Sequence, residues 1–75
     1  MPKLPILKAR DIMKVAKKNG FVYEITQGSH FIFRRPTDGK LLSIPSHKGK
    51  DLGRGITKSL IKIMGLSDDE FVKLL

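Results

Sequence analysis

Residues 21–46, FVYEITQGSHFIFRRPTDGKLLSIPS, contain three short strand patterns separated by two turn signals. Each pattern is rich in aromatic and β-branched side chains and alternates in polarity, which favours half-buried β-strands. In the first pattern, Tyr23 and Ile25 are expected to share a face with Phe21. Tight turns between neighbouring patterns predict an antiparallel three-stranded meander. The expected strands cover residues 21–26, 29–35 and 40–46.

The first turn, Gln27-Gly28, is followed at once by Ser29 and His30. Glycine can adopt the positive φ angle that a hairpin turn needs. Ser29 is expected to satisfy backbone groups at the turn, because no base and orienting residue for a nucleophilic serine are evident. Gly28 and Ser29 are therefore predicted to support the site of which His30 is part.

The second strand is expected to have one buried face and one open face, because successive side chains point in opposite directions. Phe31 and Phe33 mark the buried face. His30 and Arg34 point to the open face. A lone histidine in such a place is often only solvated, so the rest of the chain has to decide its role.

The turn at Pro36–Gly39 leaves two registers open for the second and third strands. A two-residue loop pairs residues whose numbers add to 77, and a four-residue loop pairs residues whose numbers add to 75. Both registers place Phe33 over the Leu42 side of the third strand. Both also place His30 and His47 on the same open face, roughly 5–8 Å apart, directly opposite or diagonal.

Helical patterns flank the strands. Residues 9–19 and 54–64 repeat apolar side chains at helical spacing, the second at Ile56, Leu60, Ile63 and Met64, and Gly65 is expected to end it. A capping box, Ser67 with Glu70, predicts a short C-terminal helix. The order predicts a single α+β domain over residues 1–75, α-β-β-β-α, with a three-stranded antiparallel sheet and helices on one face. Double-stranded-RNA-binding domains have this layout.

Composition narrows the function classes. The 75 residues include no cysteine, which excludes disulfides and thiolate metal sites. No apolar run has the length that a membrane span needs. The acidic residues are scattered along the chain or grouped in the expected last helix, so no metal site and no cofactor are predicted. A cytoplasmic protein without membrane attachment is expected.

The charge points to nucleic acid. Lysine and arginine number 15 against 7 aspartate and glutamate, giving +8. Neutralisation of phosphates dominates nucleic-acid affinity, although a basic surface can also be merely solvated. The glycine-rich segment before the second long helix offers a phosphate site at a helix N-terminus. The predicted RNA-binding residues are Arg34, Lys48, Lys50 and Arg54.

Several motifs, taken in order, resemble the HicA toxin family. They are Leu4-Pro5, Asn19-Gly20-Phe21, Gly28-Ser29-His30 with Phe33, Ile44-Pro45 followed by His47, Arg54-Gly55-Ile56-Thr57, and Gly65-Leu66-Ser67 with Phe71. The resemblance implies a double-stranded-RNA-binding-like fold and a messenger-RNA-cleaving toxin neutralised by a HicB-type antitoxin. It also implies that His30 is catalytic. One departure is Lys8-Ala9, where many members have a better helix cap.

The chemistry suits these residues. RNA can be cut by its own ribose 2′-hydroxyl, so the protein must move protons and stabilise charge. His30 is the expected general base, and His47 is either a second acid or base, a substrate contact, or a loop residue. Two other readings stay open. One is a non-catalytic double-stranded-RNA-binding module, and the other is a protein-interaction domain whose basic surface meets an acidic partner.

Overall fold

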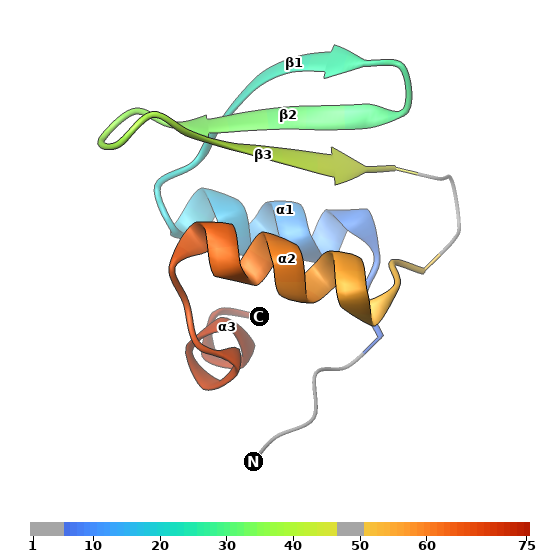
Figure 1. Ribbon diagram of the computed structural model, residues 1–75, viewed down its shortest axis with the longest axis vertical. Coiled ribbons are helices and arrows are strands. Elements are labelled where there is room, and N and C mark those ends of the chain that lie inside the picture. The colour runs from blue at the N-terminus through green and yellow to red at the C-terminus, as the bar shows by residue number, and fades with distance from the viewer. Residues whose placement is uncertain (1–5, 47–50) are drawn as a thin grey trace.

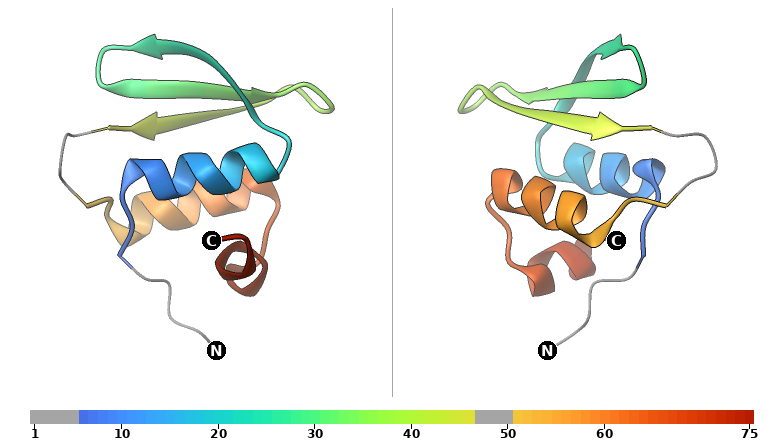
Figure 2. Two further views of the ribbon diagram at one scale, coloured as in Figure 1. Left: turned by 180° about the vertical axis from the view of Figure 1, so that it is seen from behind. Right: turned by 45° about the vertical axis from the view of Figure 1, so that its right-hand side comes forward.

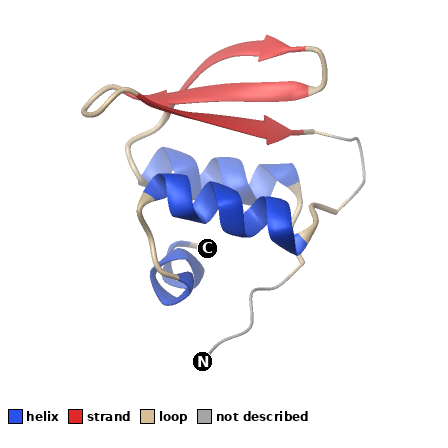
Figure 3. Cartoon of the chain, in the orientation of Figure 1, coloured by secondary structure: helices blue, strands red, loops and turns tan. Residues whose placement is uncertain are grey.

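The computed structural model describes residues 6–46 and 51–75. In chain order the elements are α1 (Ala9–Lys18), β1 (Val22–Gln27), β2 (His30–Arg35), β3 (Lys40–Pro45), α2 (Arg54–Met64) and α3 (Asp68–Leu74). The strands form one antiparallel sheet in the order β1-β2-β3, and α1 and α2 lie side by side beneath it (Figures 1 and 2). Helix α3 packs below them, on the side away from the sheet (Figure 3). This is the predicted α+β architecture.

The helix ends follow local signals. The Asp11 carboxylate accepts a hydrogen bond from the Lys8 backbone N–H at 3.0 Å, which caps α1 although the N-cap residue is a lysine. Gly65 ends α2 in the left-handed conformation, with φ 77°. In α3 the Ser67 hydroxyl accepts from the Glu70 N–H, and the Ser67 N–H donates to the Glu70 carboxylate. The latter bond lowers the pKa of Glu70.

The β2–β3 register is the one that a four-residue loop produces. Phe33 pairs with Leu42, and His30 pairs with Pro45, so paired residue numbers add to 75. Of the two registers that the sequence left open, the structure has the one in which paired residue numbers add to 75. His47, whose position depended on that choice, lies outside the described residues.

The prediction that Ile25 shares a face with Tyr23 is wrong. Tyr23 pairs with Phe33, but Ile25 pairs with Ile32, because Glu24 is an extra residue that forms a β-bulge in β1. The bulge turns Ile25 to the open face. Tyr23 stays on the other face, where its ring meets Phe33 edge-on at 5.7 Å between centroids.

The first turn is one residue later than predicted. Gly28, with φ 58°, and Ser29 form a two-residue turn that Gln27 and His30 close, so β2 begins at His30. A glycine with positive φ at the first turn position suits a tight hairpin. The Ser29 carbonyl accepts a hydrogen bond from the Ser46 N–H at 2.6 Å, which links this turn to the end of β3.

The core lies between the helices and the sheet, and α2 turns a different face to it than predicted. The buried residues of α2 are Thr57, Leu60, Ile61 and Met64. The Thr57 hydroxyl donates to the Gly53 carbonyl at 3.1 Å, so a polar residue fits this face without an unpaired group. Ile56 and Ile63, both expected in the apolar stripe, are 46% and 37% exposed. The core residues of the other elements include Ile12, Val15, Phe33, Leu42, Ile44 and Phe71.

Candidate active site

His30 lies at one end of the sheet. It is the first residue of β2 and is exposed to solvent. The β1–β2 turn, the end of β3 and the first turn of α2 all lie at this same end (Figure 1). The tight turn at Gly28 and Ser29 places the imidazole there, because a longer loop would move the start of β2.

A serine from the neighbouring strand holds the histidine. Ser43 Oγ lies 3.1 Å from His30 Nδ1. Ser43 pairs with Ile32, so it is the diagonal neighbour of His30 on the open face. Sequence reasoning missed Ser43; the register summing to 75 was the signal that could have found it.

This contact leaves the other ring nitrogen available for chemistry. In the neutral tautomer with its proton on Nδ1, the ring donates to Ser43 Oγ, and Nε2 keeps a free lone pair. In the other tautomer the serine donates, and Nε2 carries the proton. The pair can therefore present His30 Nε2 either as a proton acceptor or as a proton donor.

The start of α2 adds positive potential at the same end. Arg54 is the first residue of the helix, is exposed, and follows Gly53 as N-cap. The first turn of α2 contains no acidic residue, so the positive end of the helix dipole is not neutralised from within. The Leu52 N–H donates to the Leu7 carbonyl at 2.7 Å and so fixes the approach to the helix. Lys48 and Lys50, predicted to bind phosphate here, lie outside the described residues.

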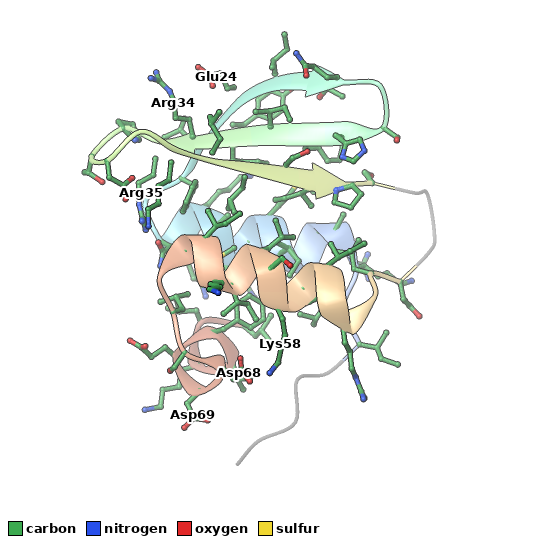
Figure 4. The ribbon with its side chains drawn as sticks, viewed as in Figure 1. Glu24, Arg34, Arg35, Lys58, Asp68 and Asp69 are labelled. Carbon is green, nitrogen blue, oxygen red and sulfur yellow. The ribbon has the colours of Figure 1, made fainter. Side chains whose placement is uncertain are left out.

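Arg34, the remaining predicted RNA contact, lies at the other end of β2 (Figure 4). It is four residues beyond His30, which is about 13 Å along a strand. Its Nε lies 3.3 Å from Glu24 Oε1 in an exposed ion pair. The structure therefore brings His30, Ser43 and Arg54 to one end and separates Arg34 from them.

The open face between these ends is more apolar than predicted. Val22, Ile25 and Leu41 are each at least half exposed on it. Among the described strand residues, Arg34 is the basic side chain of this face. An RNA strand would thus find its positive charges at the ends of the sheet and not along it.

Residues 6–46 and 51–75 contain neither a metal-binding cluster nor a membrane-spanning helix. No group of three or more His, Cys, Asp or Glu side chains in these ranges could hold a metal ion. No helix there is long and apolar enough to cross a membrane.

Comparison with known proteins identifies the family. The family described as HicA toxin of bacterial toxin-antitoxin has a model that matches residues 9–66. The chain belongs to the HicA toxin family. The match includes the three strands and both long helices, and it contains Gly28, Ser29, His30 and Arg54. It confirms the resemblance that the motifs indicated.

A curated relative of this HicA toxin is a protein of Pseudomonas fluorescens (strain Pf0-1) named probable mRNA interferase HicA. The two chains are 32% identical over 62 residues, which is 83% of this chain and 100% of the relative.

Proposed function

We propose that this HicA toxin is an endoribonuclease of the cytoplasm that cuts messenger RNA without a metal ion. His30 is the general base, and a HicB-type antitoxin neutralises the toxin. The observation that carries the proposal is the exposed His30 of the Gly28-Ser29-His30 motif, with its Nδ1 beside the Ser43 hydroxyl. Family membership and the name of the Pseudomonas relative support the same activity.

The reaction follows from what RNA itself supplies. His30 Nε2 accepts the proton of a ribose 2′-hydroxyl, and the 2′-oxygen attacks the adjacent phosphorus. The bond from phosphorus to the 5′-oxygen breaks, and that oxygen takes a proton from a second acid, for which His47 is the candidate. The products are a 2′,3′-cyclic phosphate and a 5′-hydroxyl. Each proton transfer of this kind contributes roughly 10²- to 10⁴-fold to the rate.

The cationic groups have separate tasks in this proposal. Arg54 and the N-terminus of α2 bind the phosphate beside His30 and stabilise the charge that develops on it. Lys48 and Lys50 add to the same field. Arg34 binds a phosphate further along the strand and contributes affinity but no chemistry.

The test is cleavage of a labelled structured RNA in EDTA by wild type and His30→Ala. We expect the wild type to cut and the variant to be at least about 100-fold slower, because the base is lost. The two thermal unfolding curves should coincide, since His30 is exposed.

Two Ser43 variants test whether the hydrogen bond to His30 contributes to the cleavage rate. Ser43→Ala should lower the rate about fivefold, the value of one neutral hydrogen bond of about 1 kcal/mol. Ser43→Thr keeps the hydroxyl and should restore most of the rate. End analysis of the products should find the cyclic phosphate.

Other outcomes are equally informative. If both the wild type and His30→Ala bind RNA and neither cuts it, the domain is a non-catalytic double-stranded-RNA-binding module. If both cut at the same rate, His30 is not the base. If the wild type cuts only when EDTA is replaced by a divalent cation, metal independence is wrong.

A further inference from the structure

A groove of about 410 Å³ runs between β3 and α2, and its lining is mostly aliphatic. Leu41 on β3 and Ile56 and Ile63 on α2 line it, and their side chains are 54%, 46% and 37% exposed. β3 is an edge strand, and within residues 6–46 and 51–75 no further strand pairs with it. The groove exists because α2 buries its Thr57 face and turns Ile56 and Ile63 outward.

Such a groove is an unusual surface on a chain of this charge. Large aliphatic side chains that are exposed next to one another often mark an interaction site, whereas single exposed ones need no explanation. The groove continues around the β3 edge to the half-buried Ile32 of the open sheet face. Ile25 lies opposite Ile32 on that face and is 50% exposed. An occupant would therefore meet a continuous apolar surface.

The chemistry of the lining favours a protein over RNA as the occupant. None of the described residues that line the groove is basic, so none of them neutralises a phosphate. None is aromatic, so no base can stack on it. Aliphatic side chains with two serine hydroxyls, Ser43 and Ser59, suit the apolar side chains of another protein.

Charge narrows the class of protein. The chain carries +8, and no carboxylate lines the groove. The positive field of this chain attracts an acidic partner and slows the approach of a basic one, so the expected partner is acidic. An acidic surface surrounding a few aliphatic anchors is the complementary partner.

We propose that this β3–α2 groove is the docking site of the toxin's acidic antitoxin, which inserts aliphatic side chains between Leu41 and Ile63. This inference rests on the proposed function. Ser43 connects the two sites, because it lines the groove and also contacts His30. An antitoxin seated in the groove lies against the hydrogen bond that orients the base. Docking there blocks RNA from the His30 end without filling the catalytic position itself.

The test compares Leu41→Glu and Ile63→Glu with the wild type for binding to purified HicB-type antitoxin. Each variant should weaken the complex at least about tenfold, because an anchor is lost and a negative charge faces an acidic partner. RNA cleavage without antitoxin should be unchanged, and inhibition should need correspondingly more antitoxin. Ile6→Glu is the matched control, since Ile6 is 63% exposed and does not line the groove.

Several results would overturn the proposal. One is unchanged antitoxin affinity in both groove variants, with unfolding temperatures close to that of the wild type. Another is loss of RNA affinity in these variants with antitoxin binding intact, which would assign the groove to RNA. A third is wild-type self-association that Ile63→Glu abolishes while antitoxin affinity stays the same, which would assign it to a second copy. Because antitoxin affinity is measured separately from cleavage, failure of the nuclease proposal gives a different pattern.

Discussion

At the end of the molecule where both long helices finish, the Arg35 side chain contacts four other residues. At the end where the helices begin, the His30 side chain has one hydrogen-bond partner among the described residues, Ser43. The Arg35 guanidinium donates to the Asn19 side chain after α1, to the Met64 carbonyl of α2 at 3.1 Å, and to Asp38 of the β2–β3 turn at 2.7 Å. It also lies 4.8 Å from the centre of the Phe21 ring. Its side chain is 16% exposed.

The two ends also differ in helix polarity. α1 and α2 run in the same direction (Figures 1 and 2). Their C-termini lie at the end of the sheet where β2 finishes with Arg35, and their N-termini lie at the end where β2 begins with His30. A cation at the C-termini neutralises the negative ends of both dipoles. At the His30 end the N-terminus of α1 is already capped by the Asp11 carboxylate. The first turn of α2 has no acidic residue, so its positive end would attract an anion there. We infer that one end is built for stability, and that the other keeps its hydrogen-bonding capacity for a ligand.

The sharpest test of this contrast is Arg35→Ala compared with Arg34→Ala, its neighbour on the same strand. Loss of Arg35 should lower the midpoint of thermal unfolding by roughly 10 °C or more, because the Met64 carbonyl and Asn19 lose a charged donor together. Arg34→Ala removes only the exposed pair with Glu24 and should shift the midpoint by about 2 °C or less. Equal shifts for the two arginines would contradict the contrast.

Local signals made much of this fold predictable. The bounds of α2, the glycine that ends it and the capping box of α3 each depend on residues within one turn of one another, and all are as predicted. His30 was predictable as an exposed strand residue because Phe31 and Phe33 marked the other face.

The features that escaped prediction depend on packing between segments. The bulge at Glu24, which turns the Ile25 side chain to the open face, forms only when β1 pairs with β2. The rotation of α2 follows from packing against α3 and the sheet, because the helical spacing within Arg54–Met64 is compatible with either face. Ser43 required the strand register, and the role of Arg35 required the positions of both helix C-termini. In the candidate site, the exposed position of His30 was therefore predictable, but its contact with Ser43 was not.

The acid stability of the Arg35 end gives a second, smaller effect. The hydrogen bond from Arg35 lowers the pKa of Asp38 from 3.8 to about 2. Because the folded-state pKa is the lower one, this carboxylate stabilises the fold above its unfolded pKa, and the stabilisation is lost as the pH falls toward about 2. Asp38→Asn should thus be less stable than wild type at pH 7, and the difference should shrink between pH 4 and pH 2.

Urea unfolding at pH 7, 4, 3 and 2 measures this difference. The comparison with Asp38→Asn isolates Asp38 from Glu70, whose pKa is also lowered and which titrates in both proteins. A difference that stays constant down to pH 2 would show that Asp38 acts as a turn residue and not as the counter-ion of Arg35.

The smallest effect concerns Arg34, which lies at the Arg35 end of β2 but is exposed like His30. If it binds one RNA phosphate, Arg34→Ala should weaken binding a few-fold and reduce the slope of log affinity against log salt by about 1. The cleavage rate of bound RNA should not change, because Arg34 is about 13 Å from His30 along the strand. Arg54→Ala, at the His30 end, should reduce the slope similarly and also slow cleavage of bound RNA. An equal loss of cleavage rate in Arg34→Ala and Arg54→Ala would contradict the proposal that Arg54 acts on the reacting phosphate and Arg34 only on binding.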